Sequence, residues 1–230
     1  MGKLWIVAAL LSALSAQAQV VKHVDIFKEP ERFAGWPANY GIWSWGDEVL
    51  VGFSLGYYKK NPTGGHDIDS ERPSSPHLAR SLDGGETWTI EPQQITNVEG
   101  GLTEPIDFSN PDMALQFRGS NFFHSADRGK SWTGPYPLLE VGRESLLART
   151  DYIVEDKSTV TAFIAATKAN GKEGQPLCIR TKDGGRTWEL VGWIGQEPPE
   201  GYGYAIMPST VRLDNGAYLS MIRRAGVFDG

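Results

Sequence analysis

Cysteine is almost absent from this sequence, since Cys178 is the only one in the chain. A lone cysteine cannot form an intramolecular disulfide bond, so packed sheets rather than cross-links must stabilise the protein. Cys178 lies in the apolar run Leu-Cys-Ile, where burial as a small hydrophobic residue is expected. A catalytic thiol is the alternative, but no histidine lies nearby in a motif that would activate it.

An excess of basic residues is also missing. The chain carries 22 Lys and Arg against 28 Asp and Glu, which gives a formal net charge of −6 at pH 7. A mildly acidic chain lacks the basic footprint that is typical of proteins that bind nucleic acid. We therefore expect no nucleic acid partner.

The longest apolar run lies within the first 18 residues. Lys3 is followed by the apolar run 4–14 and by the tripeptide Ala-Gln-Ala at 16–18. This order is typical of a secretory signal peptide with an Ala-x-Ala cleavage site, and the run is too short to cross a membrane. We therefore expect a signal peptide at residues 1–18, a mature chain without a membrane span, and a secreted or periplasmic location.

Glycine and aromatic residues are plentiful, and an eight-residue pattern occurs three times. SLDGGETW (81–88), SADRGKSW (125–132) and TKDGGRTW (181–188) share the plan Ser/Thr-x-Asp-x-Gly-x-Ser/Thr-Trp. The shared positions predict a β-hairpin turn, because the aspartate can accept hydrogen bonds from N–H groups of its own turn and the glycine can adopt a positive φ. The tryptophan that follows would open the next strand and pack between layers.

The repeated pattern resembles the Asp-box of the sialidase (neuraminidase) superfamily. The members of that family are β-propellers, and the box lies at the turn between the third and fourth strands of a blade. The resemblance implies a structural role far from the substrate for Asp83, Asp127 and Asp183. A calcium loop is the alternative, but the D-x-[DN]-x-[DN]-G ligand spacing is missing. The boxes therefore predict architecture and leave function to other residues.

Runs with strand composition flank every box and predict an all-β propeller of four-stranded antiparallel blades. The predicted runs of the first blade are 41–45, 48–58, 77–81 and 87–92. Those of the second are 112–119, 121–126 and 131–138, and those of the third are 148–156, 159–168, 176–183 and 187–195. The box aspartates at 83, 127 and 183 are 44 and 56 residues apart, a repeat that favours a propeller over a sandwich.

A fourth blade begins near Tyr204, where Asn215-Gly216 is a strong hairpin signal between two alternating strands. About three and a half blades are therefore expected, whereas six blades at this repeat length need on the order of 300 residues. We expect residues 19–230 to be a sialidase-like propeller domain of the six-bladed type that is incomplete at its C-terminus. A closed ring of four blades is the alternative.

The resemblance also implies a catalytic set. In sialidases three arginines grip the substrate carboxylate, an aspartate is the general acid/base, and a tyrosine paired with a glutamate is the nucleophile. A neutral tyrosine suits an anomeric carbon that bears a carboxylate, because an anionic nucleophile would be repelled. Arginine matches a carboxylate through two parallel hydrogen bonds and stays charged. The resemblance implies no metal and no organic cofactor.

The candidate for the first clamp arginine is Arg32, in the run Arg-Phe-Ala-Gly-Trp-Pro. It lies further from the proline than in the Arg-Ile-Pro-like motif of the family, and Gly35 would take the arginine position if Pro37 were aligned. The alternative is a solvated residue of an entry loop.

The candidates for the general acid/base are Asp69 and Asp67, in the loop before the first box. They alternate along an extended segment, so at most one of them can face the channel. The alternative is a solvated polar loop. A metal site that uses His66 and Asp67 lacks a third ligand in the sequence.

The second strand of the fourth blade ends in Arg223 and Arg224, whose side chains point to opposite faces of the strand. We expect one of them to face the substrate, and the spacing favours Arg223. The glutamate of the family would fall near Met207 and is not present. The third arginine and the tyrosine would belong to later blades.

Together these features favour a secreted sialidase-like glycoside hydrolase that releases terminal sialic acid, or a related acidic sugar, from sialylated or other acidic glycans. A non-catalytic glycan-binding or scaffold propeller is the first alternative, and the missing glutamate favours it. A propeller enzyme for neutral or uronic polysaccharides is the second, and it would need a carboxylate pair without an arginine cluster.

Overall fold

The computed structural model describes residues 22–172, 174–199 and 203–225, so the expected signal peptide lies outside the described residues. The described residues form fifteen β-strands and one helix of four residues, α1 (Pro37–Tyr40). They contain no helix that is long and apolar enough to cross a membrane. The prediction of an all-β protein is confirmed.

The first sheet is organised around one long strand, β3 (Glu48–Tyr57), whose interior is buried. β1 (Arg32–Gly35) and β2 (Ile42–Trp45) pair with the two halves of the same edge of β3, because α1 interrupts the chain between them. β4 (Ser75–Ser81) pairs with the other edge, and β5 (Thr89–Pro92) follows on the outside. All of these pairs are antiparallel, as expected.

The second sheet differs from the expected blade in one strand. β7 (Ala114–Arg118), β8 (Asn121–Ser125) and β9 (Trp132–Pro137) form the predicted antiparallel runs. The fourth strand, β6 (Ile95–Asn97), comes from the segment before them and pairs with β9 in parallel. This short strand occupies the outer edge of β9, whose N–H and C=O groups would otherwise stay unpaired.

The third and fourth sheets follow the expected order. β10 (Tyr152–Val154), β11 (Val160–Ala166), β12 (Gln175–Thr181) and β13 (Glu189–Trp193) pair in sequence and are antiparallel. β14 (Tyr204–Arg212) and β15 (Tyr218–Ala225) form the predicted hairpin. Its turn contains Gly216, whose φ is 81°.

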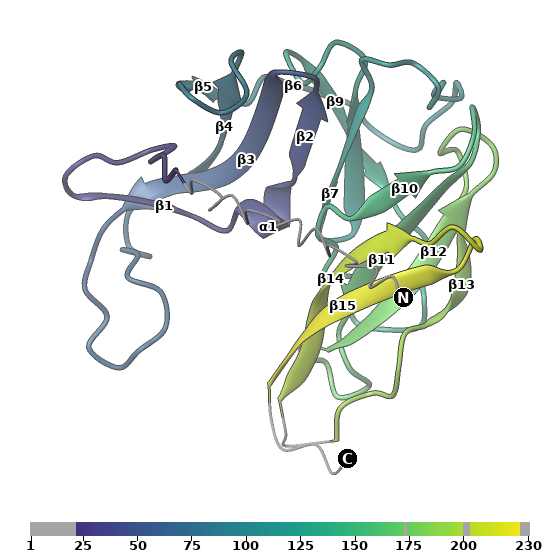
Figure 1. The fold of residues 1–230 in the computed structure, drawn as a ribbon. Helices are drawn as coiled ribbons and strands as arrows, with labels where there is room; N and C mark the ends of the chain where they lie inside the picture. Colours follow the sequence, from purple (N-terminus) through teal and green to yellow (C-terminus); the bar gives the residue numbers. More distant parts are fainter. Residues whose placement is uncertain (1–21, 173, 200–202, 226–230) are drawn as a thin grey trace, which may run out of the picture.

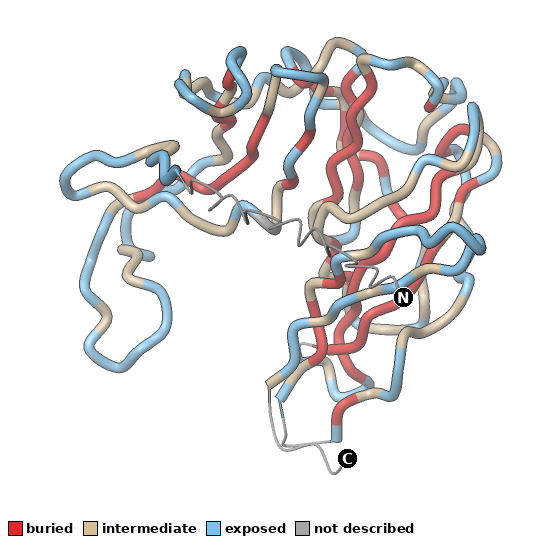
Figure 2. The backbone as a smooth tube through the Cα atoms, viewed as in Figure 1, coloured by how far each residue is buried: buried red, intermediate tan, exposed pale blue. Residues whose placement is uncertain are grey.

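The four sheets follow one another around the molecule, and most of the core lies between neighbours (Figures 1 and 2). Between the first and second sheets, the buried residues include Trp43, Leu50 and Trp132. Between the second and third sheets, they include Phe117 and Ile164. The architecture is therefore a series of antiparallel sheets of up to five strands, packed face to face.

The three box turns (residues 81–88, 125–132 and 181–188) contain the same set of hydrogen bonds. In the second turn, Asp127 Oδ1 accepts hydrogen bonds from Ser125 Oγ at 2.7 Å and from the Ser131 N–H at 3.0 Å. Asp127 Oδ2 accepts another from Ser131 Oγ at 2.6 Å. Asp83 and Asp183 accept the equivalent bonds in the other two turns. The predicted hairpin turns are thus confirmed, between β4 and β5, β8 and β9, and β12 and β13.

The glycine of the second turn is required by both conformation and space. Gly129 has a φ of 74°, and a Cβ atom at this position would lie 2.3 Å from Leu50 Cδ2. The indole of Trp132 lies against the same glycine, donates from Nε1 to the Gly129 carbonyl at 3.1 Å, and is fully buried. The predicted wedge between layers is therefore present in the second turn.

Cys178 lies in β12 and is buried. Burial raises the pKa of its thiol to about 11, so the reactive thiolate is scarce at neutral pH. The prediction of a buried, unreactive cysteine is confirmed.

Candidate functional site

Several strands begin or end on one side of the molecule, which we call the mouth (Figure 1). β1, β10 and β14 begin at the mouth, and β3, β7 and β15 end there. Hydrogen bonds near the mouth connect the first sheet to the second and the third. The Tyr40 carbonyl accepts one from Gln116 Nε2 at 3.0 Å and another from Thr150 Oγ1 at 2.9 Å.

The box turns lie at the opposite ends of the strands. Strand β4 begins beside the mouth end of β3, where Ser75 pairs with Leu55, and it runs away from the mouth into the first turn. The boxes are therefore separated from the candidate arginines and acids, as the resemblance implies.

Arg32 lies at the start of β1, next to the end of β3. It is half-buried, its Nε donates to the Gly56 carbonyl at 2.9 Å, and its guanidinium lies 4.7 Å from the centre of the Tyr57 ring. A second guanidinium, that of Arg72, lies 3.1 Å from the centre of the same ring. Two cationic groups thus flank Tyr57 on this side of the mouth, and the sequence pattern had indicated only Arg32.

The loop that carries the candidate acids is anchored to β3, since the Asp69 N–H donates to the Tyr57 carbonyl at 2.8 Å. The Asp69 carboxylate accepts a hydrogen bond from the Glu71 N–H at 3.2 Å and lies 3.5 Å from Lys59 Nζ. Its side chain is only 16% exposed. The structure therefore brings Asp69 and Arg32 to the same residue, Tyr57.

Asp67 lies further out along this loop. It accepts a hydrogen bond from the Asn61 N–H at 2.8 Å and one from Lys60 Nζ at 3.1 Å. These two donors lower the pKa of the Asp67 carboxyl. An acid held in its charged form is a poor proton donor, so the geometry favours Asp69 over Asp67 as a group that acts on a substrate.

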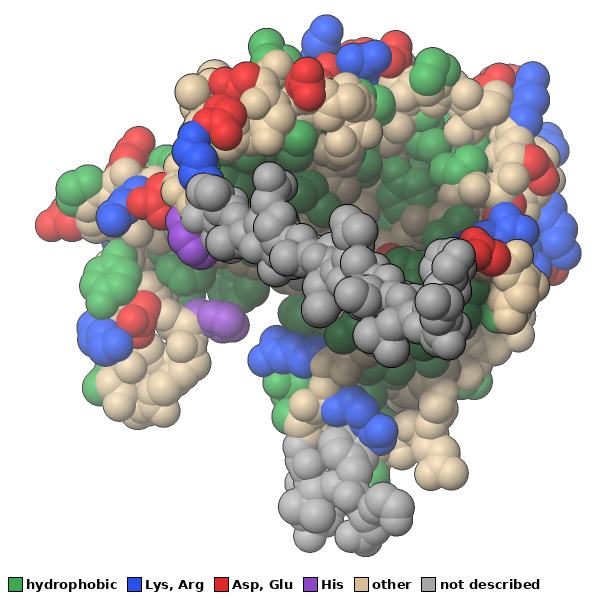
Figure 3. All heavy atoms as spheres, in the orientation of Figure 1, with side chains coloured by type: hydrophobic (Ala, Val, Ile, Leu, Met, Phe, Trp, Pro, Cys, Tyr) green, Lys and Arg blue, Asp and Glu red, His purple; other side chains and the backbone are tan. Residues whose placement is uncertain are grey.

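Arg223 and Arg224 are both exposed and lie at the mouth end of β15. The guanidinium of Arg223 lies 5.1 Å from the centre of the Tyr204 ring and donates to Met207 Sδ at 3.7 Å. Figure 3 shows a hollow on this side, with Lys and Arg side chains on one flank and His side chains on the other. Arg32 belongs to the first sheet and Arg223 to the fourth.

A β-bulge occurs in β14 where the family glutamate was expected. The register with β15 shifts between Ile206 and Ser209, and Met207 adopts a left-handed φ of 54°. A bulge bends its strand and changes the direction of the neighbouring side chains. Here it places Pro208 and Ser209 beside a cavity between the first, third and fourth sheets, which we call the axial cavity.

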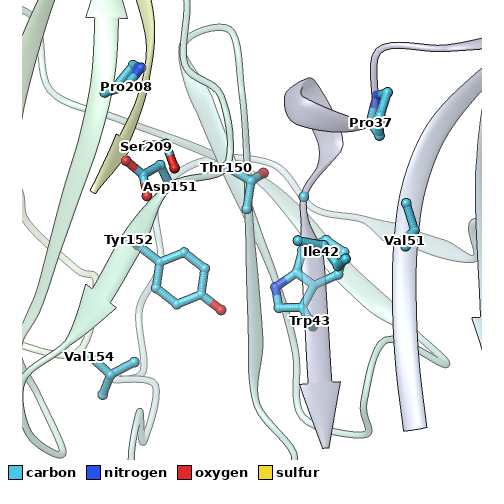
Figure 4. A pocket seen from close by; sticks show the side chains of 11 residues that line it. Pro37, Ile42, Trp43, Val51, Thr150, Asp151, Tyr152, Val154, Pro208 and Ser209 are labelled. Carbon is cyan, nitrogen blue, oxygen red and sulfur yellow. The ribbon is translucent and has the colours of Figure 1, made fainter. Parts of the chain in front are cut away.

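This axial cavity has a volume of about 650 Å³, within the usual range for small-molecule sites. Figure 4 shows Asp151 and Ser209 on one wall, with Ile42, Trp43 and Val51 on the opposite wall. Its lining combines residues from α1, β2, β3, the start of β10 and β14: Pro37, Gly41, Ile42, Trp43, Val51, Thr150, Asp151, Tyr152, Val154, Pro208 and Ser209.

Asp151 is the acidic residue of the axial cavity, and sequence reasoning missed it. Burial raises the pKa of its carboxyl to about 6, although the Thr210 N–H donates to Oδ1 at 3.4 Å. Oδ2 is buried and has no hydrogen-bond partner among the described residues. The signal that could have found it is its position, because an acid at the start of the first strand of a sheet can line the space between neighbouring sheets.

The described part of the chain contains no group of three His, Cys, Asp or Glu side chains that could hold a metal ion.

No family model matches this chain. No curated protein matches it either. Its structure is similar to the crystal structure of a protein of unknown function from Dyadobacter fermentans, with a TM-score of 0.62 at 18% sequence identity. The similarity covers 88% of this chain and 65% of that one, so the chain spans about 65% of the length of the protein that it matches. At this identity the likeness supports the fold alone.

Proposed function

We propose that this protein is a secreted or periplasmic, sialidase-like glycoside hydrolase on a six-bladed Asp-box β-propeller. Its substrates would be glycans that end in sialic acid or a related acidic sugar. Three box turns that share the same aspartate hydrogen bonds, each joining two neighbouring antiparallel strands of successive face-to-face sheets, support the architecture.

The observation that carries the proposed activity is the combination of side chains at the mouth. The Arg32 guanidinium lies over the Tyr57 ring, the Asp69 N–H donates to the Tyr57 carbonyl, and Arg223 lies over Tyr204 at the mouth end of β15. Separate guanidinium groups suit a ligand that carries a carboxylate, because each can donate two hydrogen bonds to it and remains charged at any working pH. The Asp69 carboxyl, on the loop beside β3, would then act on the bound sugar.

The test is an assay of the full chain, together with any longer natural form, on fluorogenic glycosides of sialic acid, glucuronic acid and neutral hexoses. We expect turnover of an acidic glycoside, and a loss of about 100-fold or more in kcat/KM for one of the two variants Arg223→Ala and Arg224→Ala, with the other nearly unchanged. Arg186→Ala is the matched control, because Arg186 is an exposed arginine in the third box turn, away from the mouth.

A second candidate, a non-catalytic glycan-binding propeller, is supported by a specific observation. The carboxylates of Asp67 and Asp69 both pair with lysines, at 3.1 and 3.5 Å, and the pKa of Asp67 is lowered by its donors, so these ion pairs can serve binding without proton transfer. Calorimetric binding of sialic acid by a protein that turns over no glycoside would favour this candidate. Absence of both binding and turnover would reject both functions.

A further inference from the structure

Asp151 occupies an environment unlike that of the other acids at the mouth. Its side chain lies on the wall of the axial cavity beside Ser209, and the opposite wall is apolar (Figure 4). Thr210 is its hydrogen-bond partner, with the N–H at a long 3.4 Å from Oδ1, and its Oδ2 atom is buried without a partner among the described residues. A buried carboxyl that lacks donors is stable as the neutral acid, which has a proton to give.

Among the described residues, those that line the cavity with Asp151 supply no opposite charge. α1, β2 and β3 contribute only Pro37, Gly41 and uncharged side chains, and β14 contributes Pro208 and Ser209. Tyr152 OH accepts a hydrogen bond from the Leu115 N–H at 3.1 Å, and burial raises the pKa of this phenol, so it stays neutral.

The nearest acid along the strand is engaged elsewhere. Glu155 lies 3.2 Å from Arg180 Nη2 and accepts hydrogen bonds from Tyr218 OH at 2.9 Å and from Thr161 Oγ1. Its charge is therefore compensated within its own cluster. Asp151 is left as the isolated acid of the cavity.

Glycoside hydrolysis needs a group that gives a proton to the departing oxygen. Asp67 and Asp69 both lie beside lysines, whereas the cavity acid has no cation beside it within the described residues. A raised pKa in an apolar pocket is the usual property of such a donor.

We propose that Asp151 is the catalytic proton donor of this mouth and that the bond to be cleaved lies over the axial cavity. The proposal rests on the proposed glycosidase function. The Asp151 carboxyl gives its proton to the glycosidic oxygen as the bond from that oxygen to the anomeric carbon breaks. A water molecule then supplies hydroxide to the anomeric carbon, and its remaining proton restores the acid. The net reaction consumes one water and needs no oxidant, reductant or cofactor.

The test compares the full-length protein with Asp151→Asn on two acidic glycosides that differ only in the leaving group. One carries a sugar or alkyl alcohol, and the other carries dinitrophenolate, which departs without a proton. In Asp151→Asn we expect kcat on the sugar or alkyl glycoside to fall about 100-fold or more, because general acid catalysis contributes about 100- to 10,000-fold. We expect kcat on the dinitrophenyl glycoside to fall less than about 10-fold. Asp214→Asn is the matched control, because Asp214 is exposed in the β14–β15 turn.

The wild-type pH profile gives a second measurement that does not depend on the variant. We expect activity on the alkyl glycoside to decline above about pH 6, where the donor loses its proton, and the dinitrophenyl glycoside to show no such decline. Three results would each overturn the role of Asp151. They are an unchanged kcat in Asp151→Asn, equal losses of kcat on both substrates, and a wild-type activity that stays constant between pH 5 and 8. If Asp69→Asn showed the leaving-group dependence instead, the donor would be Asp69. If the wild type cleaved no glycoside at all, the proposed function itself would fail.

Discussion

The raised pKa of Asp151 has a measurable consequence for stability. The carboxyl has an ordinary pKa of 3.8, and burial raises it to about 6 in the folded protein. The folded chain therefore holds this proton more tightly than the unfolded chain does. As the pH rises from below 4 to above 6, the free energy of unfolding decreases, because the folded state must keep a charged carboxylate in a poorly solvated cavity.

The magnitude follows from the shift. About two pKa units correspond to at most about 3 kcal/mol of lost stability between pH 4 and pH 8. Asp151→Asn keeps the shape of the side chain and removes the ionisation. The variant and the wild type should therefore differ little at pH 4, and the variant should be more stable by up to about 3 kcal/mol at pH 8.

Urea denaturation of both proteins at a series of pH values measures this difference directly. Other titrating groups cancel in the comparison, because the two chains differ only at Asp151. A gap between the two proteins that stays constant from pH 4 to pH 8 would refute the raised pKa and the burial from which it follows. The measurement needs no substrate, so it tests the cavity independently of any activity.

Three further outcomes are expected. Asp127→Ala should lower the free energy of unfolding by about 1 to 3 kcal/mol in urea denaturation, because the N–H and hydroxyl donors of its turn lose their acceptor, and an unchanged midpoint would contradict that role. Glu48→Gln should lower the free energy of unfolding by about 3 kcal/mol, because the Glu48 side chain is 13% exposed and pairs with Arg80 at 2.6 Å and Arg128 at 2.9 Å. A loss below about 0.5 kcal/mol would mean that these ion pairs are solvated. Of Arg223→Ala and Arg224→Ala, one should abolish turnover of an acidic glycoside and the other should leave it nearly intact, since their side chains leave opposite faces of β15; full activity in both would remove β15 from the site.

The features that could be predicted from the sequence are those decided by local interactions. The bonds that define a box turn join residues at most four positions apart, so eight residues are enough to specify the turn that contains Asp127. The hairpin at Gly216 is equally local, because a glycine with positive φ fixes its turn. Most strand positions follow from these turns and from the apolar runs between them.

The features that could not be predicted depend on residues far apart in the chain. β6 is a strand because its edge groups meet β9, whose residues lie more than 30 positions later. Asp151 has a raised pKa because α1, β2, β3 and β14 surround it, and nothing in its own segment indicates that burial. The sequence places Arg32 near the first sheet, but the acceptor that orients its guanidinium is the Gly56 carbonyl, in another strand.

The carboxylates of this protein fall into two groups that respond to protons in opposite ways. Burial alone would raise the pKa of Asp127, but the Ser131 and Ser125 donors outweigh it and lower the pKa, so the box turn weakens as the pH falls. Asp151 has a cavity in place of donors, so its environment becomes unfavourable as the pH rises. Because donors at one end of the sheets hold the first acid charged, it can brace a turn but cannot give a proton. Because the cavity at the other end keeps the second acid neutral up to about pH 6, this acid can protonate a leaving group below that pH. Aspartate thus serves as a structural group at one end of the sheets, in Asp127, and as a candidate reactive group at the other, in Asp151. The direction of the pKa shift follows from the number of N–H and O–H donors that contact each carboxyl.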